Sequence, residues 1–395
     1  MKGNSVCLVN GRSLMPPLSG VGRATFELCR RIFRPGDDWT PLYYYGWYTR
    51  NLLDLESTGS VEKKFKSRAL KTALSVVRSN DLLKRAARGM LEVCAGLGSP
   101  KDGSPRLYWE PNHVILQHLE ARFRLLTLHD LSCLRHPEWH PRERLDFFNS
   151  RFLPGIQRAD GIVTVSEAIR REVMNTLKLP EDRVICVHNG VDRERFRPLP
   201  GDELERFRLE RGLREGFVLC VGSLEPRKNL TNLLDGWLSL PKRLRSGYRL
   251  LLIGNAGWSN EDVMKKIREN GDSILLRSDV PAEDLPRYYN LAEFFVCVSL
   301  YEGFSLPPLE ALACGTPVLA SDIAVHREIL RDGAVYVNPG SAAKIAEALE
   351  VFLTAPPDRG TARKKGVERA GNFTWEAAAL QYRSIMKNFL EESGI

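Results

Sequence analysis

The chain has 395 residues, of which 43% are hydrophobic and 27% are charged, and it carries a formal net charge of +8. This length is more than one hydrophobic core usually organises, so we expect two domains. The composition is that of a globular protein, and no apolar run approaches the length of a membrane span. The first residues contain one lysine and no long apolar core, so we expect no secretory signal.

Eight cysteines are scattered singly along the chain. None of them forms a C-x-x-C pair or a Cys/His metal pattern, and several lie inside apolar runs. This distribution predicts buried free thiols in a reducing cytosol. We therefore expect a cytoplasmic protein without a metal site.

The first half of the chain shows apolar strands and a helical pattern. A strand is predicted at 5–11 and a helix at 20–33. Further strands that end in polar residues are predicted at 124–130, 161–167 and 183–192. Continuous apolar strands of this kind are typical of a parallel sheet that is covered on both faces.

Residues 61–90 form a strongly basic stretch, with nine Lys or Arg and two acidic residues. Apolar residues recur through it at helical spacing, which gives an amphipathic pattern. This pattern predicts docking on an anionic membrane surface or acceptor through Lys63, Lys64, Lys66 and Arg68. A solvated helix that packs its apolar side on its own domain fits equally well. Nucleic acid is not expected as a partner, because the stretch has one aromatic residue and no recognition motif is visible.

From residue 216 onward, strands and helices alternate regularly. Strands are predicted at 216–222, 248–255, 273–278, 293–301, 316–322 and 334–340. Helices are predicted between or after them at 230–240, 261–270, 282–292, 306–315 and 341–354. This order predicts a second doubly wound parallel sheet.

The two halves are joined by residues 195–216, a charged segment with two prolines that we interpret as a linker. We place an N-terminal domain at 1–198 and a C-terminal domain at 199–375. The last residues, 376–395, are expected to form a helix that crosses back to the N-terminal domain. The predicted fold class is α/β, with two doubly wound Rossmann-like domains facing each other across a cleft. Ligands of such sheets bind beyond the carboxyl ends of the strands, so the polar loops there are the candidate site.

The loop after the strand at 293–301 has the composition of an anion site. Glu302 follows the strand directly, and Pro307 and Pro308 fix the start of the next helix, because proline is tolerated in a first helical turn. Backbone N–H groups at a helix start favour a phosphate. Here these groups belong to Gly303, Phe304, Ser305 and Leu306. Glu310 lies about one turn inside the helix, so a carboxylate on either side could bind hydroxyl groups. An ordinary helix start with a surface glutamate is the alternative.

A second loop, at 222–230, also lies between a predicted strand and a predicted helix. Arg227 and Lys228 are adjacent cations in this loop. Arg offers a rigid fork for phosphate oxygens, and Lys offers a compact point charge. Exposed cations are common in loops, but this pair lies at the same predicted sheet edge as Glu302. We therefore interpret the pair as a candidate phosphate site.

Two loops of the first domain complete the set. Residues 20–23 read G-x-G without the third glycine of a dinucleotide fingerprint, so a dinucleotide cofactor is disfavoured. Gly22 still allows the backbone to approach a phosphate or sugar, and a tight turn is the alternative. His129 ends the strand at 124–130 and can hydrogen-bond a sugar hydroxyl or relay a proton. A structural histidine is the alternative there.

Taken together, these motifs resemble those of retaining glycosyltransferases of family 4. The stretch EGFSLPPLEALACGTPVLAS resembles the E-x7-E signature of that family. VGSLEPRKN, GVGR, TLHDLS, VSE and HNGVD resemble further motifs of the family in the expected order, so the resemblance covers nearly the whole chain. It implies the GT-B fold. In detail the chain looks most like bacterial enzymes that add mannose or related sugars to lipopolysaccharide O-antigen chains.

The resemblance implies a role for individual residues. Arg227 and Lys228 match the cation pair that holds the donor diphosphate, and Glu310 matches the glutamate that bonds the ribose hydroxyls. Glu302 and His129 match the catalytic pair near the donor sugar. The other implied donor contacts are Gly22, Gly303, Phe304 and Leu306.

Ser305 departs from the family pattern, in which E-G-F-G is the frequent form. A serine adds a small side chain next to the sugar, which puts the identity of the sugar in doubt more than the activity. We keep Ser305 among the donor-binding residues.

The resemblance implies transfer of a hexose, mannose or a related sugar, to a lipid-linked or polysaccharide acceptor in cell-surface glycan synthesis. A GDP-mannose-type donor is favoured, and another nucleoside-diphosphate sugar such as a UDP-sugar is the second choice. No metal cofactor is expected, because Arg227, Lys228 and a helix start would neutralise the leaving diphosphate. Such an enzyme would be cytoplasmic and peripheral at the inner face of the plasma membrane.

Two other functions remain open. A sugar-nucleotide epimerase or a phosphorylase on the same fold would share the phosphate loops, but it would not release a nucleoside diphosphate in an acceptor-dependent way. A non-catalytic membrane-binding scaffold would act through the basic stretch at 61–90. The presence of both glutamates and both cations argues against a site that has lost its activity.

Overall fold

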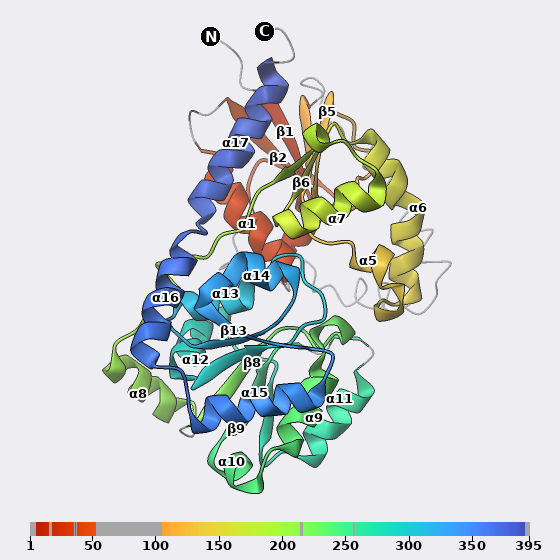
Figure 1. Cartoon of the computed structure of the whole chain (residues 1–395). Coiled ribbons are helices and arrows are strands. Elements are labelled where there is room, and N and C mark those ends of the chain that lie inside the picture. Colours follow the sequence, from red (N-terminus) through yellow and green to blue (C-terminus); the bar gives the residue numbers. More distant parts are fainter. Residues whose placement is uncertain are drawn as a thin grey trace, which may run out of the picture.

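A computed structural model describes residues 5–391 of the protein, apart from 16, 17, 35, 37, 53–104, 214, 215, 256 and 259. The chain folds as two α/β domains, drawn one above the other in Figure 1. Each has a mainly parallel sheet with non-sequential strand order, so the predicted fold class is confirmed. The four cations singled out in the basic stretch, Lys63, Lys64, Lys66 and Arg68, lie outside the described residues.

The described part of the N-terminal domain contains a seven-stranded sheet with the order β3-β2-β1-β4-β5-β6-β7. All neighbouring strands are parallel except β2 and β3. The strands are β1 (Ser5–Asn10), β2 (Trp39–Tyr44), β3 (Tyr48–Thr49), β4 (Leu107–Glu110), β5 (Phe123–Leu128), β6 (Gly161–Thr164) and β7 (Val184–Cys186). The described α-helices are α1 (Gly20–Ile32), α5 (Ser132–Arg135), α6 (Arg142–Arg158) and α7 (Glu167–Leu177).

The C-terminal domain contains a six-stranded, fully parallel sheet with the order β10-β9-β8-β11-β12-β13. Its strands are β8 (Phe217–Val221), β9 (Arg249–Ile253), β10 (Ile274–Arg277), β11 (Phe294–Cys297), β12 (Val318–Ser321) and β13 (Ala334–Val337). Its helices are α8 (Gly201–Glu210), α9 (Leu230–Ser239), α10 (Lys242–Gly247), α11 (Glu261–Glu269), α12 (Leu285–Leu291), α13 (Leu306–Ala313), α14 (Ala324–Leu330), α15 (Ala342–Thr354) and α16 (Arg359–Gly371). The crossovers put helices on both faces of the sheet, as the alternating sequence pattern predicts.

The last helix, α17 (Trp375–Glu391), packs against α1 of the N-terminal domain (Figure 1). Its Tyr382 is buried under the sheet, with its ring centroid 5.1 Å from that of Trp109. The Tyr382 hydroxyl lies 2.9 Å from the Thr127 hydroxyl of β5. The chain therefore returns to the N-terminal sheet after it has completed the C-terminal one.

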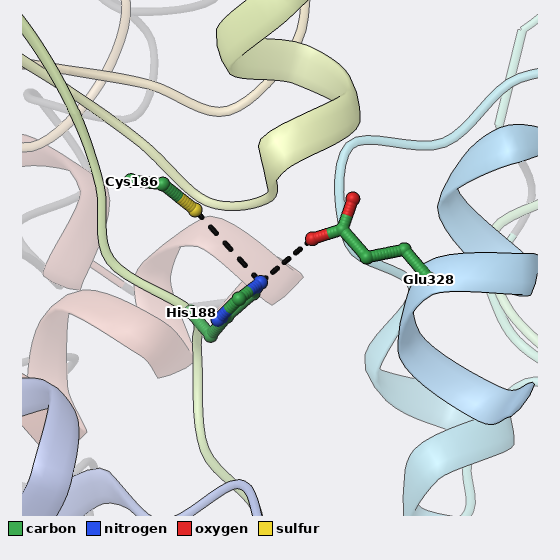
Figure 2. A group of neighbouring side chains, drawn as sticks. All are labelled: Cys186, His188 and Glu328. Atoms are coloured by element: carbon green, nitrogen blue, oxygen red, sulfur yellow. Dashed lines mark hydrogen bonds and ion pairs between the residues drawn. The ribbon is translucent and has the colours of Figure 1, made fainter.

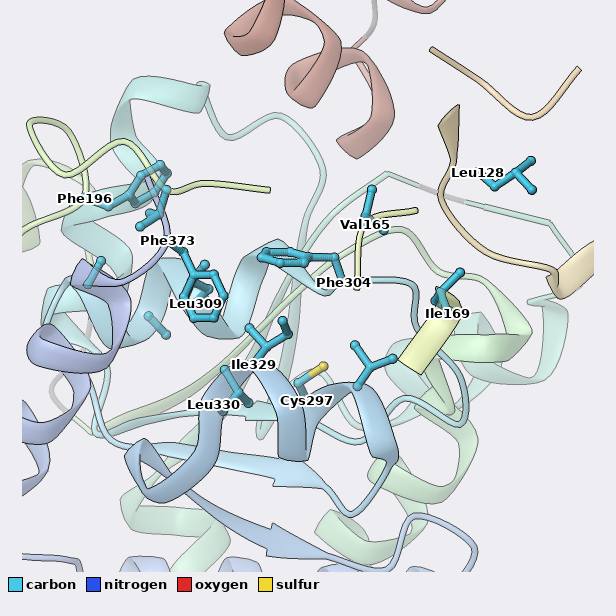
Figure 3. Close-up of a cluster of buried hydrophobic side chains, with 14 of the residues drawn as sticks. Leu128, Val165, Ile169, Phe196, Cys297, Phe304, Leu309, Ile329, Leu330 and Phe373 are labelled. Atoms are coloured by element: carbon cyan, nitrogen blue, oxygen red, sulfur yellow. The ribbon is translucent and has the colours of Figure 1, made fainter. Parts of the chain in front are cut away.

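One apolar cluster continues from one domain into the other (Figure 3). The N-terminal domain contributes Leu128, Val165 and Ile169, and the C-terminal domain contributes Phe304, Leu309 and Ile329. The ring of Phe304 also lies 5.8 Å from that of Phe373, which precedes α17. Burial of apolar area is the main favourable term in association, so this cluster holds the two sheets in a closed arrangement.

Three polar side chains, Cys186, His188 and Glu328, form a hydrogen-bonded group between the domains, here called the interdomain tie (Figure 2). Glu328 of α14 accepts the backbone N–H groups of Glu167 and Ala168 at 2.8 and 2.7 Å. These groups begin α7 of the other domain, where the helix dipole favours a carboxylate. His188 donates to the same carboxylate at 2.7 Å, and the Cys186 sulfur lies 3.8 Å from the same His188 nitrogen. Glu328 thus caps a helix across the domain boundary.

The bonds of Glu328 predict a contribution to the free energy of unfolding that depends on pH. Burial alone would raise the pKa of Glu328, but the bonds from His188 and from the start of α7 lower it below its ordinary value. A carboxylate with a lowered folded pKa stabilises the protein above its unfolded pKa, and that stability is lost as the pH falls through the folded value. Glu328→Gln should therefore melt a few degrees below wild type at pH 7 in scanning calorimetry. The difference should shrink as the pH falls below about 4.5.

Glu347→Gln is the matched control, because Glu347 is an exposed glutamate of the same domain that pairs with Lys344 alone among the described residues. It should melt like wild type at both pH values. A Glu328→Gln deficit that is the same at pH 7 and pH 4 would show that the carboxylate charge does not hold the domains together.

Candidate active site

The charged centre of the cleft is Glu302, which lies in the loop after β11 and is 4% exposed. Its carboxylate pairs with two cations of the loop after β8. Arg227 Nη1 lies 2.7 Å from Glu302 Oε2, and Lys228 Nζ lies 2.5 Å from Oε1. The hydroxyl of Ser299 donates to Oε1 at 2.8 Å. The structure thus brings together three residues that the sequence analysis placed at one sheet edge.

These groups set one another's charge. Burial would raise the pKa of Glu302, but Lys228 and Arg227 hold it well below its ordinary value. Burial would lower the pKa of Arg227, but Glu302 and Glu225 raise it above its ordinary value. Buried charges are costly unless they are paired, so each side of this cluster depends on the other. A diphosphate that binds the two cations would replace the carboxylate as their counter-ion.

The helix start predicted after Glu302 is present. α13 begins at Leu306, with Pro307 and Pro308 in its first turn, and Gly315 ends it with a φ of +77°. Ser305 precedes the helix with a φ of 70°, a region that disfavours residues with a side chain. This conformation explains why glycine is frequent at the position, and strain of this kind is typical of functional sites.

Glu310 lies inside α13 and is 5% exposed. Its Oε2 accepts the hydroxyl of Tyr289 at 2.9 Å, and its Oε1 pairs with Arg23 Nη1 at 3.2 Å. Arg23 comes from the first turn of α1, so this pair crosses the cleft. Tyr289 and Arg23 were not predicted as site residues. The only sequence signal for Arg23 is its position directly after the G-x-G turn.

The N-terminal wall of the site is the loop after β5. His129 Nε2 donates to the carbonyl of Pro111 at 2.8 Å, and burial lowers its pKa, so the imidazole is neutral at pH 7. The next residue, Asp130, accepts the backbone N–H of Ser132 at 2.8 Å. Burial opposes its ionisation, but His113, Arg227 and the bonds from Ser132 hold the pKa of Asp130 at about 2. Both sides of the cleft therefore contribute ionised groups.

The two walls meet at Gly303. A Cβ at this position would lie 1.9 Å from the carbonyl oxygen of His129, so only glycine fits the closed cleft. The hydroxyl of Ser166 donates to the carbonyl of Gly303 at 2.7 Å. Ser166 also caps α7 by accepting the N–H of Ile169. Its contact with the other domain was not predicted, because it depends on how the domains dock.

Three other candidate donor contacts, Gly22, Phe304 and Leu306, have a role in packing. A Cβ at Gly22 would lie 2.2 Å from the carbonyl of Ser13, so glycine lets α1 pack against the turn that follows β1. The Phe304 side chain is buried in the interdomain cluster. The side chain of Leu306 is partly buried against the same cluster. Contacts of these three with a donor remain predictions.

One group of described residues has the spacing of metal ligands, namely Cys186, His188 and Glu328. It is the interdomain tie of Figure 2. Its members already bond one another, and Glu328 also accepts two backbone N–H groups. Burial and nearby carboxylates raise the pKa of Cys186, so its sulfur stays a thiol rather than the thiolate that metals prefer.

Comparison with known proteins agrees with this geometry. The description "Glycosyl transferases group 1" matches residues 202–369, and "Glycosyltransferase Family 4" matches residues 111–195. O-antigen chain mannosyltransferase B of Escherichia coli is 30% identical over 375 residues, which cover 92% of this chain and 95% of the relative. The chain belongs to glycosyltransferase family 4. The predicted family and the predicted class of enzyme are therefore confirmed.

One further relative and one solved structure are also similar to this chain. O-antigen chain mannosyltransferase RfbU of Salmonella typhimurium is 25% identical over 74% of this chain and 75% of the relative. The crystal structure of Anabaena HepE in complex with UDP and glucose matches 98% of this chain and all of that one, with a TM-score of 0.69 and 16% identity. The second similarity shows the fold alone. Within the described ranges, which leave out 53–104, no helix has the length and hydropathy needed to cross a membrane.

Proposed function

We propose that this glycosyltransferase moves mannose or a related hexose from a nucleoside-diphosphate sugar to a cell-surface glycan, with retention of the anomeric configuration. The observation that carries the proposal is the buried carboxylate of Glu302, which is shared by Arg227 and Lys228 beside the start of α13. This arrangement keeps two cations in place for an anionic ligand and a carboxylate in place for hydroxyl groups.

In the proposed complex, the donor diphosphate binds Arg227 and Lys228 together with the backbone N–H groups at the start of α13. Glu302 is then released to accept a hydroxyl of the donor sugar. Glu310 accepts the ribose hydroxyls and is oriented by its bond from Tyr289. Neutral His129 keeps Nδ1 for a sugar hydroxyl, because its Nε2 is bonded to a carbonyl.

The reaction breaks the bond between the sugar C1 and the diphosphate oxygen and forms a bond between C1 and the acceptor oxygen. The acceptor proton goes to the leaving diphosphate, which departs from the same face, so the configuration is retained. Arg227, Lys228 and the start of α13 stabilise the charge that develops on the leaving group. We propose that the reaction needs no metal ion, because these groups supply the positive charge.

Two relatives are named as O-antigen chain mannosyltransferases, so we favour GDP-mannose as the donor. A UDP-sugar is the second candidate, because a structure with the same fold was solved with UDP and glucose. We propose a lipid-linked glycan as the acceptor, reached by a cytoplasmic protein that binds the inner face of the plasma membrane.

The donor site is tested by the double variant Arg227→Ala, Lys228→Ala. Each charge-assisted contact is worth about 1.5–3 kcal/mol, so the Kd for GDP in calorimetry should rise well over tenfold. A control variant that removes two exposed cations of the same domain, Arg327→Ala with Lys344→Ala, should bind GDP as wild type does.

Transfer from GDP-mannose to a glycan acceptor should persist in EDTA and be lost in the site variant.

Unchanged GDP and UDP affinity in the site variant would remove these cations from the donor site. Conversion of the donor sugar without acceptor-dependent release of the nucleoside diphosphate would contradict glycosyl transfer. Loss of activity in EDTA that added magnesium restores would contradict the metal-free reaction.

The membrane proposal rests on the charge of residues 61–90, where nine Lys or Arg face two acidic residues. Each cation near an anionic surface contributes about 1 kcal/mol, and salt screens it. The protein should therefore co-sediment with anionic liposomes at low salt and separate from them at high salt. Reversal of Lys63, Lys64, Lys66 and Arg68 to Glu should abolish this binding and leave GDP affinity intact. Undiminished liposome binding by the reversed variant would contradict the proposal.

A further inference from the structure

The pair between Arg23 and Glu310 joins α1 of the N-terminal domain to α13 of the C-terminal domain. Arg23 Nη1 lies 3.2 Å from Glu310 Oε1, and the side chains are 27% and 6% exposed. Tyr289 donates to Oε2 of the same carboxylate at 2.9 Å. Both oxygens of Glu310 are therefore occupied by the protein itself.

This occupation conflicts with the ribose role that the proposed function gives to Glu310. A carboxylate that binds two ribose hydroxyls needs both oxygens as acceptors. Tyr289 can keep its bond, because an oxygen has two lone pairs, but the broad guanidinium of Arg23 occupies the space in front of Oε1. Ribose and Arg23 therefore compete for one position.

The side chain of Arg23 can move away from Glu310, and this movement would leave its positive charge without a partner. Within the described part of the chain, Glu310 is the one carboxylate that pairs with Arg23. The side chain is partly exposed, while its backbone is fixed by the tight packing of Gly22 on the carbonyl of Ser13. Burial and the charge of Arg23 lower the pKa of Arg195, so these two guanidinium groups lie close enough to repel each other. A displaced Arg23 needs a new anion.

We propose that Arg23 is a donor-positioning residue that pairs with Glu310 as the structure shows and moves to the donor diphosphate when ribose takes its place. The proposal rests on the proposed function, which supplies the ribose and the diphosphate. Arg23 lies at the positive end of α1, a 13-residue helix whose start favours an anion. The N-terminal domain would thereby contribute one cation to a diphosphate held mainly by the C-terminal domain.

The exchange predicts effects of opposite sign for two ligands. A nucleoside has ribose but no phosphate, so it competes with Arg23 and gains nothing from the released cation. Removal of Arg23 should tighten nucleoside binding about two- to fivefold, the range expected for loss of a partly exposed ion pair. A nucleoside diphosphate gains the charge-assisted contact in wild type, so its binding should weaken about tenfold.

The test compares Arg23→Met with wild type by calorimetry, using guanosine and GDP, and uridine and UDP as the second pair. Arg30→Met is the matched control, since Arg30 lies on the same helix and pairs with Glu27 and Asp192 instead. It should bind all four ligands as wild type does. Arg23→Lys retains the charge and should restore most of the diphosphate affinity without restoring the full competition with nucleoside.

Tighter nucleoside and weaker diphosphate binding in Arg23→Met supports the exchange. If Arg23→Met binds both ligands more weakly, Arg23 has only a structural role. If it binds both as wild type does, Arg23 has no role in binding. Either result overturns the proposed exchange. Glu310→Gln separates this failure from failure of the proposed function. If Glu310→Gln does not weaken the nucleoside, the ribose role of Glu310 is wrong. If it does weaken the nucleoside while Arg23→Met shows no change of opposite sign, only the exchange is wrong.

Discussion

The structure depends on one buried carboxylate that neutralises two cations. Glu302 is almost fully enclosed, and it is ionised because Arg227 and Lys228 lie against it. An unpaired buried charge costs several kcal/mol, so the carboxylate and the two cations stabilise one another. The charge of the two cations is therefore balanced by an internal ion pair. In the proposed complex a donor diphosphate replaces the carboxylate, which then accepts a hydroxyl of the sugar.

Residues next to Glu302 also hold the domains together. Gly303 allows the loop of the C-terminal domain to touch the backbone of His129, and the next residue, Phe304, fills the apolar cluster between the domains. Glu328 adds a helix cap across the boundary at the end of the following βα unit. The loop that carries Glu302 is therefore part of the domain interface.

Local sequence was enough to predict the parts of the site that depend on local structure. Two prolines after Ser305 determine where α13 begins, and the strand-to-helix pattern places Arg227 and Glu302 at the same edge of one sheet. The strands β2 and β4 were not predicted; β2 contains a proline, which weakens a strand pattern. The bond of Arg23 to Glu310 joins residues 287 positions apart, so it follows from domain docking and leaves no trace in either segment. The left-handed conformation of Ser305 was hidden for the same reason, since its neighbours and not its own side chain impose it.

The central claim is that the carboxylate of Glu302 competes with the donor diphosphate for Arg227 and Lys228. Calorimetric titration of GDP into wild type and Glu302→Gln tests it most directly, with Glu293→Gln as a surface control in the same domain. The amide keeps the shape of the side chain and removes the competing charge, so Glu302→Gln should bind GDP several-fold more tightly than wild type. Weaker GDP binding by Glu302→Gln, with the control unchanged, would contradict the account.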